Sequence, residues 1–573
     1  MTGRTAESSS AGFVPWPDEV AARYRAKGYW EGRPLADAIF AAADADPRAI
    51  ALVDGDKRVS YGELTSRVDG TALRLHGLGL RADDRILVQL PNGWEFVVLM
   101  LACLRLGVIP VLALAAHRRQ ELAYLAGHAG VRAIAVPGAL RGFDHQALAR
   151  EIADTHDGLD HVLVAAGEVH ARNVDLRKLC EPADGLSVAR RQLDSAAPAG
   201  GAVALMLLSG GTSGLPKLIA RTHDDYGCYA RRVAEVSRFG RDTVFLAVLP
   251  LGHSLPLGMT LATLRSGGRV VVSGSPAPAK VFAMIETEGV TVTAAVPAIA
   301  QTWLEHRRAD PGHDLSSVRL LLVGGARLPD ELARQMVPAL TSVLQQGYGM
   351  AEGLVCITRP EDPAEVTCHT QGRTLCAHDE LLIVDESGEP VTDGETGELL
   401  TRGPCTPRGY YRAPEYNAQA FTADGWLHTG DVVRRRPDGN VVVEGRIKDM
   451  INRGGEKISA EEVENLAYQV EGVLAAAAVA MPDPELGERV CLYVVVRPGC
   501  EVSLADLEQV LEATGMARYK MPERLIVRDA LPLTPIGKID KKALRANAAE
   551  GIFQIAHLPK PAAVSATLDG AGR

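Results

Sequence analysis

The feature that most constrains the fold is a regular alternation of helical and strand-like segments that begins at Tyr61. Residues 61–79 have the periodicity of an amphipathic helix. Alternating helices and buried strands predict an α/β fold in which mainly parallel sheets are wrapped by helices. The strands are expected in short apolar runs, each typical of a strand buried on both faces, at 85–90, 133–137, 161–166, 244–250, 269–274, 292–297 and 319–325.

The pattern changes after Glu398, where short strands are separated by Asp-Gly turns. Such turns are typical of antiparallel ribbons, so a β-rich lobe is expected to begin there. The segment 445–459 is rich in charge and glycine, which indicates a hinge.

A new mixture of helices and strands follows from Ser459. Residues 460–470 and 504–515 are typical of helices, and residues 475–482 and 490–496 are typical of strands. This mixture predicts a small, mobile α+β domain. The predicted parts are a large N-terminal domain at 1–447, a C-terminal domain at 448–547 and a flexible tail at 548–573.

Charge and cysteine usage exclude several function classes. The 573 residues carry a formal net charge of −10, which argues against a surface for nucleic acid or an anionic membrane. The nine cysteines form no CxxC pair, so the sequence predicts neither a disulfide framework nor a zinc site. The N-terminus has no apolar core of a secretory signal. A cytoplasmic location with reduced thiols fits these observations.

The most apolar stretch of the chain is residues 94–116. It is interrupted by Arg105, Gly107 and Pro110. These residues favour a buried helix, a turn and a strand over a membrane span.

A glycine-rich loop, SGGTSGLPK, occupies residues 209–217 after the apolar run 203–208. Such a loop can direct several backbone N–H groups and hydroxyls at one ligand, most often a polyphosphate. A Walker loop requires GxxxxGK[ST], which the residues around Lys217 do not provide. A dinucleotide-binding GxGxxG opens a helix, which Pro216 discourages. Two interpretations of the loop stay open: a phosphate-binding loop of another kind, and an ordinary surface turn.

Further motifs follow this loop in order. They are LLVGGARL at 321–328, QGYGMAEG at 346–353, GELLTRGP at 397–404, WLHTGDVV at 426–433, GRIKDMINRGGEKIS at 445–459 and PIGKIDKKALR at 535–545. Together with LSGGTSGLPKLIARTH at 208–223 they resemble the adenylate-forming superfamily, which contains acyl-CoA synthetases, peptide-synthetase adenylation domains and luciferases. The resemblance covers roughly residues 13–547.

Within that superfamily the chain looks most like the stand-alone aryl-acid AMP ligases of siderophore and aryl-capped antibiotic pathways. The similar segments are FVPWPDEVAARYRAKGYW at 13–30, ARTHDDY at 220–226, the Gly-His-x-x-Pro-Leu stretch at 252–257 and INRGGEKISAEEVE at 451–464.

This resemblance implies an enzyme that uses ATP and Mg²⁺ to join a carboxylate to the α-phosphorus, giving an acyl adenylate and pyrophosphate. Two anions must approach each other, so cations and N–H dipoles are needed between them. The residues implied to hold the β and γ phosphates are Ser209, Gly210, Gly211, Thr212, Ser213, Gly214 and Lys217.

The rest of the nucleotide is assigned in the same way. The resemblance implies that Tyr348 stacks on adenine, that Gly325 lets the backbone approach the base, and that Asp431 accepts hydrogen bonds from the ribose. The resemblance also implies that Gln346 and Arg446 belong to the nucleotide site. It implies that Glu352 binds Mg²⁺, a cation that prefers oxygen ligands. Taken singly, Tyr348 could be a core aromatic residue, Gly325 and Asp431 could serve packing or a turn, and Glu352 could cap a helix.

The catalytic lysine is expected at Lys538, whose mobile ammonium group would offset charge that accumulates between the carboxylate and the α-phosphate. Lys541 and Lys542 are the alternatives nearby. By resemblance Lys448 lies at the hinge, so the C-terminal domain is expected to present Lys538 in one half-reaction and a second loop in the other. That loop comprises Gly454, Gly455 and Lys457.

The acid pocket is expected to be unusual. We interpret His253 as the aromatic residue beside the substrate carboxylate. The alternative is a structural role in the core. Members for salicylate and 2,3-dihydroxybenzoate have Asn after this His and Val before the motif Tyr, where this chain has Ser254 and Gly347. These exchanges enlarge the pocket, so we expect a substituted hydroxy- or aminobenzoate, a hydroxypicolinate or a quinoline-type acid. The remaining expected pocket residues are Leu255, Met259, Gly324 and Gly349.

The thiol that accepts the acyl group is expected on the phosphopantetheine of an aryl carrier protein acting in trans, with coenzyme A as the alternative. Two competing functions stay open. One is an acyl-CoA synthetase, and the other is an inactive protein that binds an adenylate without turnover.

Overall fold

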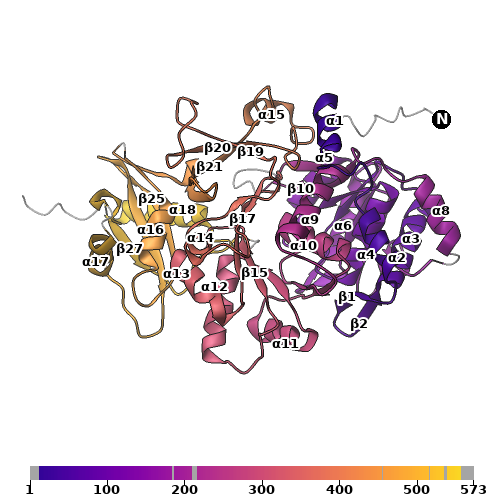
Figure 1. Cartoon of the computed structure of the whole chain (residues 1–573), viewed down its shortest axis with the longest axis horizontal. Helices are drawn as coiled ribbons and strands as arrows, with labels where there is room; N and C mark the ends of the chain where they lie inside the picture. The colour runs from indigo at the N-terminus through magenta and orange to yellow at the C-terminus, as the bar shows by residue number, and fades with distance from the viewer. Residues whose placement is uncertain are drawn as a thin grey trace, which may run out of the picture. The chain divides into compact units, whose positions relative to one another are not determined.

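The computed structural model describes residues 12–183, 186–209, 216–454, 456–514, 517–534 and 538–555. The chain divides into two compact units, Met1–Glu444 and Gly445–Arg573 (Figure 1). The functional boundary after residue 447 stays a proposal.

The first sheet of the larger unit has, within the described residues, the strand order β11-β10-β4-β3-β5-β8-β9. All neighbours are parallel except β10 and β11. Its strands are β3 (Arg85–Val88), β4 (Ile109–Leu112), β5 (Ala133–Val136), β8 (His161–Val164), β9 (Val174–Asp175), β10 (Val203–Leu208) and β11 (Leu218–Thr222).

Helices alternate with strands along this part of the chain, as predicted. Among them, α3 packs against both α4 and α8 (Figure 1), and it begins where the Ser60 side chain accepts a hydrogen bond from the Glu63 N–H. The helices of this part are α1 (Asp18–Ala26), α2 (Asp37–Ala45), α3 (Tyr61–Gly77), α4 (Trp94–Leu106), α5 (Arg119–Ala129), α6 (His145–Thr155), α7 (Leu176–Leu179) and α8 (Leu186–Ser195). A short hairpin joins β6 (Ala139–Leu140) to β7 (Phe143–Asp144).

The second sheet has, over the described part of the chain, the order β18-β17-β16-β15-β14-β12-β13-β1-β2. Its middle strands, from β16 to β1, are parallel. The strands are β1 (Ile50–Asp54), β2 (Lys57–Ser60), β12 (Val244–Ala247), β13 (Arg269–Val272), β14 (Val292–Ala295), β15 (Leu320–Gly324), β16 (Leu344–Gly349), β17 (Val355–Ile357) and β18 (Arg373–Thr374). Its helices are α9 (His223–Val236), α10 (Ser254–Arg265), α11 (Pro278–Glu288), α12 (Pro297–Ala309), α13 (Asp330–Ala339) and α14 (Ala364–His369).

These two sheets confirm the predicted α/β class. Each of the seven predicted runs contains a strand, namely β3, β5, β8, β12, β13, β14 or β15, and residues 61–79 contain α3. The apolar stretch 94–116 forms the buried helix α4, a left-handed turn at Gly107 (φ 77°) and β4, as expected. No helix within the described ranges is long and apolar enough to cross a membrane.

The β-rich lobe is antiparallel, as predicted, but it begins earlier than the predicted start after Glu398. Its first strand begins at Glu380 and belongs to the lobe because it pairs antiparallel with β20 over five residues. The connection between the two strands contains both a turn held by the Asp385 carboxylate and the Asp393–Gly394 pair. The strands are β19 (Glu380–Val384), β20 (Thr396–Arg402), β21 (Leu427–Arg435) and β22 (Val441–Arg446), and α15 (Pro414–Ala420) lies between β20 and β21 in the chain.

The smaller unit contains the helices and strands predicted after Ser459. Its sheet, in the described residues, has the order β24-β23-β26-β25, with β27 beside β26. The elements are η1 (Ile447–Asp449), β23 (Ile451–Arg453), β24 (Glu456–Ile458), α16 (Ala460–Ala467), β25 (Val473–Asp483), β26 (Gly487–Val496), α17 (Leu504–Thr514), η2 (Arg518–Lys520), β27 (Arg524–Val527) and α18 (Lys541–Ile555).

The predicted tail begins too early. Helix α18 continues past residue 548 to Ile555, because Leu544 and Ala548 are buried against Tyr493 of β26. Residues 556–573 lie outside the described ranges.

Candidate active site

The predicted site residues of the larger unit follow the carboxyl ends of parallel strands in one sheet. His253 comes after β12, Gly325 directly follows β15, and Gly349 ends β16. Since β12, β14, β15 and β16 are consecutive parallel neighbours, their carboxyl ends share one edge. Loops at such an edge are where α/β sheets bind ligands.

Tyr348 and Asp431 are brought together by this arrangement. The Tyr348 hydroxyl donates a 2.7 Å hydrogen bond to Oδ2 of Asp431, which is only 4% exposed. The Asp431 N–H donates to Oγ1 of Thr429. The nine-stranded sheet and the β-rich lobe thus supply one side chain each to a partly buried polar pair.

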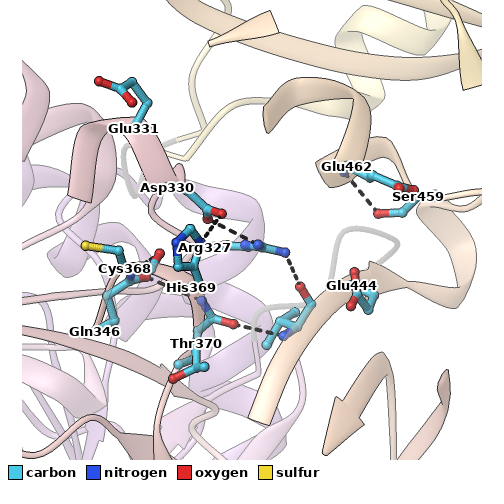
Figure 2. A network of polar contacts seen from close by, with 12 residues as sticks. Arg327, Asp330, Glu331, Gln346, Cys368, His369, Thr370, Glu444, Ser459 and Glu462 are labelled. Carbon is cyan, nitrogen blue, oxygen red and sulfur yellow. Dashed lines mark hydrogen bonds and ion pairs between the residues drawn. The ribbon is translucent and has the colours of Figure 1, made fainter. Parts of the chain in front are cut away.

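The turn after β15 is fixed by a polar network (Figure 2). Gly325 has a φ of 85°, a left-handed conformation that favours glycine. The Arg327 guanidinium then donates to the Val443 carbonyl oxygen at 3.0 Å and to Oδ1 of Asp330 at 3.2 Å. His369 Nδ1 lies 2.6 Å from the other oxygen of Asp330. These contacts hold the Gly325 turn to β22.

Gln346 belongs to a second set of contacts in the same view. Its side-chain amide is buried and donates to the carbonyl oxygens of Thr367 at 2.7 Å and Cys368 at 3.2 Å. Its oxygen accepts a 3.3 Å hydrogen bond from Gln371. The structure therefore gives the Gln346 side chain a positioning role two residues before Tyr348, and its predicted contact with nucleotide stays a prediction.

Glu352 has a partner that sequence reasoning did not identify. The Tyr410 hydroxyl donates a 2.8 Å hydrogen bond to Oε1 of Glu352. Burial and the nearby carboxylate raise the pKa of Tyr410, so the phenol stays protonated and acts as the donor. Tyr410 follows the GELLTRGP motif closely, and this position was the one signal available in the sequence.

Arg221 also escaped sequence reasoning, although it lies in the segment 220–226 that carries the subgroup resemblance. Its guanidinium is fully buried and forms an ion pair with Asp225 at 3.1 Å. It donates at 2.9 Å to the carbonyl oxygens of Ala351 and Cys405. Arg221 therefore ties the residue before Glu352 to the segment that precedes Tyr410.

The base of the glycine-rich loop is closed by two hydrogen bonds. The Ser209 N–H donates to the Lys217 carbonyl at 2.9 Å, and the Lys217 N–H donates to the Ser209 hydroxyl at 3.0 Å. The Lys217 ammonium lies 3.7 Å from the centre of the Tyr416 ring and 5.7 Å from that of Tyr410. The predicted phosphate contacts of Gly210, Gly211, Thr212, Ser213 and Gly214 lie outside the described residues.

Four of the predicted acid-pocket residues lie just before or within the first half of α10, namely His253, Ser254, Leu255 and Met259. His253 is the residue before this helix, and the carbonyl oxygen of Ser254 accepts a 3.1 Å hydrogen bond from the buried Tyr226 hydroxyl. Met259 is fully buried in the core and Gly349 is exposed.

Leu255, Gly324 and Gly347 gather around Leu322. A β-carbon at Gly324 would lie 3.1 Å from the Gly347 carbonyl oxygen and 3.6 Å from Cδ2 of both Leu255 and Leu322, whereas one at Gly347 would come no closer than 3.6 Å, to Cδ2 of Leu322. A side chain at Gly347 would therefore meet only ordinary contacts, whereas one at Gly324 would be crowded.

The smaller unit holds the other predicted residues. Arg446 and Lys448 are exposed at the start of η1, and Gly454 has a φ of 61° between β23 and β24. Lys457 lies on β24 opposite Asn452, whereas Gly455 is outside the described residues. Their roles stay predictions.

The structure gives contacts for both Lys538 and the nearby Lys541. The Lys538 backbone N–H donates to Thr534 Oγ1 at 3.1 Å, and its carbonyl accepts from the Thr534 N–H at 2.7 Å. Lys541 forms a 2.7 Å ion pair with the partly buried Glu464. Lys541 therefore has a structural partner inside the smaller unit.

Comparison with known proteins agrees with these features. Residues 39–411 match the AMP-binding enzyme family, and residues 462–538 match the AMP-binding enzyme C-terminal domain. The chain is 57% identical to a 2-hydroxy-7-methoxy-5-methyl-1-naphthoate–CoA ligase of Streptomyces carzinostaticus over 96% of this chain and 99% of the relative. It is also 57% identical to a salicylyl-CoA synthase/salicylate adenylyltransferase of a Streptomyces species, over 93% and 97%.

A solved structure also supports membership of this family. The apo structure of Mycobacterium smegmatis MbtA is similar with a TM-score of 0.71 and 42% identity, over 94% of this chain and 99% of that one. The chain therefore belongs to the AMP-binding enzyme family and is an ATP-dependent adenylating enzyme of the aryl-acid subgroup.

Proposed function

We propose that this enzyme adenylates an aromatic acid other than 2,3-dihydroxybenzoate, with an ortho-hydroxylated two-ring acid as the leading substrate and salicylate as the second. The observation that carries the proposal is Gly347, which has no side chain although a β-carbon there would make only ordinary contacts with Leu322 and Ile357. The naphthoate–CoA ligase at 57% identity supports a two-ring acid, and the salicylate relative supports the second candidate.

The nucleotide is proposed to bind at the carboxyl edge of the nine-stranded sheet. Tyr348 would stack on adenine and Asp431 would accept from the ribose, supported by the 2.7 Å contact that positions the two side chains. Lys217 and the loop 209–217 would neutralise the β and γ phosphates. The exposed backbone of Gly325 would lie against the base.

Mg²⁺ is proposed to be held by Glu352. The oxygen atoms at this position fit a hard cation, since the Glu352 carboxylate and the Tyr410 hydroxyl lie together. The described residues hold no group of three or more metal-ligating side chains, which suits a cation bound through one carboxylate and substrate phosphates. When bound, the cation would supply charge neutralisation between the phosphates.

Adenylation itself is proposed to need Lys538 of the smaller unit. Its ammonium would offset the charge shared by the attacking carboxylate and the α-phosphate, while His253 borders the carboxylate. Pyrophosphate leaves as the carboxylate oxygen bonds to the α-phosphorus. Rotation about Lys448 would then present Gly454, Gly455 and Lys457 for thioester formation.

The acceptor thiol is proposed to be that of phosphopantetheine, which coenzyme A and carrier proteins share. Coenzyme A leads, because both relatives at 57% identity have names that contain it. An aryl carrier protein in trans is the second candidate, through the resemblance to carrier-loading members of the subgroup.

The test is ATP–pyrophosphate exchange with a panel of acids: 2-hydroxy-1-naphthoate, salicylate, 2,3-dihydroxybenzoate, anthranilate, 3-hydroxypicolinate, quinaldate and octanoate. We expect kcat/KM to be highest for the naphthoate. A preference for 2,3-dihydroxybenzoate over the others would refute the pocket proposal, and exchange with no acid would identify an inactive binding protein. Mass spectrometry of reactions with coenzyme A or a holo aryl carrier protein then identifies the acceptor.

A further inference from the structure

A cavity of about 400 Å³ lies in the larger unit beside α1 and the start of β19. None of its lining residues belongs to the proposed catalytic machinery. The lining comprises Arg23, Tyr24, Lys27, Tyr29, Ala377, His378, Asp379, Glu380 and Arg402. A volume of this size is within the range of small-molecule sites.

The cavity has an excess of cationic groups. Arg23 and Lys27 are exposed and one helical turn apart, and neither forms an ion pair with any residue that the structure describes. The third cation, Arg402, is already paired with Glu380 at 2.9 Å and with Asp424 at 3.1 Å. Arg23 and Lys27 therefore carry two positive charges that no ion pair among the described residues neutralises, and the Arg23 guanidinium lies 5.7 Å from the centre of the Tyr24 ring.

One wall of the cavity is aromatic. The rings of Tyr29 and His378 are stacked with centroids 4.1 Å apart and an interplanar angle of 29°. Desolvation, together with Lys27 and Arg232, lowers the pKa of His378, so its ring is neutral near pH 7. Stacked planar rings of this kind favour a planar partner.

Asp379 adds an unusual polar group. Only 8% of this residue is exposed, and its Oδ1 has no hydrogen-bond partner among the described residues. Burial raises the pKa of Asp379 well above its usual value, with the neighbouring Cys376 adding to the effect. A protonated carboxyl group donates a hydrogen bond and brings no negative charge, so it does not oppose an anion.

From these contacts we propose that this cavity is a second ligand site, separate from the active site, for a small planar aromatic anion. Arg23 and Lys27 would bind its carboxylate or phosphate group, and the ring would lie against His378 and Tyr29. The proposal does not depend on which acid the enzyme activates.

The test is isothermal titration calorimetry of the full-length enzyme whose active site is saturated with a non-hydrolysable aryl-adenylate analogue. The probes are 2-hydroxy-1-naphthoate for a carboxylate, AMP for a phosphate, and inorganic phosphate alone. We expect one further site for the naphthoate or for AMP, and the better probe identifies the anionic group. Inorganic phosphate should bind at least about ten-fold more weakly, because it lacks a ring.

Two variants of different kinds locate that site. The double variant R23Q/K27Q removes the unpaired charges, and Ala377→Leu fills the cavity without changing charge. Each should weaken the second binding event about ten-fold or more, whereas Lys57→Gln, a lysine over the ring of Trp94 elsewhere on the unit, should not change it. Absence of a second binding event in the wild type, or binding unaffected by both variants, would overturn the proposal.

Discussion

The Tyr410 hydroxyl and the Glu352 carboxylate, 58 positions apart in the chain, are joined by a 2.8 Å hydrogen bond. Tyr410 also lies 5.7 Å from the Lys217 ammonium, measured to the ring centre. One phenol thus contacts the proposed Mg²⁺ ligand and lies near the proposed phosphate-binding lysine. This arrangement makes Tyr410 a positioning residue for the triphosphate end of the nucleotide site.

Tyr410→Phe should lower the rate of pyrophosphate exchange about ten-fold, since it removes one hydrogen bond to a charged group. It should also raise the Mg²⁺ concentration needed for half-maximal rate. A Mg²⁺ titration of exchange measures both. The control is Tyr411→Phe, because the buried Tyr411 hydroxyl has no hydrogen-bond partner among the described residues. If the Mg²⁺ titration curve of Tyr410→Phe overlays that of the wild type, Tyr410 has no positioning role.

Arg221→Met should lower the free energy of unfolding by about 3–5 kcal/mol, because it leaves the buried Asp225 carboxylate without its cation. It also leaves the carbonyl oxygens of Ala351 and Cys405 without their donor. Urea denaturation measures the change. Arg58→Met is the control. Its ion pair with Glu288 involves an exposed guanidinium, so the expected loss is much smaller. Equal losses in the two variants would contradict the argument.

Lys538→Ala should lower the adenylation rate by about 10²–10³-fold or more while leaving the urea midpoint near that of the wild type. The physical reason is the loss of an ammonium group that offsets charge in the transition state. Pyrophosphate exchange gives the rate. The exposed Lys542→Ala is the matched control, and near-normal turnover of Lys538→Ala would refute the assignment.

Gly347→Val should shift acid preference toward single-ring substrates. Its β-carbon would meet Leu322 and Ile357 at ordinary contact distances of 3.6 and 3.7 Å, so the variant should fold. The two methyl groups would occupy the space proposed for the second ring. We expect kcat/KM for 2-hydroxy-1-naphthoate to fall about ten-fold or more relative to salicylate. An unchanged ratio would place the second ring elsewhere.

His223 should make folding sensitive to acid. Burial lowers the pKa of His223 from 6.5 to about 4, and its Nδ1 accepts a hydrogen bond from the Leu35 N–H. Because the folded pKa is depressed, this contribution to stability is present above pH 6.5 and is lost as the pH falls toward 4. The difference between 6.5 and about 4, at 1.36 kcal/mol per unit, corresponds to about 3 kcal/mol.

The measurement is the free energy of unfolding at pH 7.5 and at pH 4.5, compared between the wild type and His223→Asn. Asn retains an acceptor but does not titrate, so the variant should lose less stability over this interval. Parallel losses in the two proteins would show that other groups cause the acid sensitivity.

The sequence alone determined the α/β class, the positions of most strands and the motifs of the nucleotide site. Local patterns are sufficient for these features. A run such as 319–325 is apolar along its length whatever surrounds it. A glycine such as Gly325 is required by its own backbone angle. The start of the β-rich lobe was missed because β19 belongs to it through its antiparallel pairing with β20, which local sequence does not contain.

Tertiary structure decided which polar side chains meet. The contacts between Tyr348 and Asp431, between Tyr410 and Glu352, and from Arg221 to Cys405 each join segments more than 50 residues apart. Such contacts depend on the order and register of the strands, which local periodicity does not contain. The same is true of the cavity beside α1, because residues 23–29 and residues 377–402 both line it.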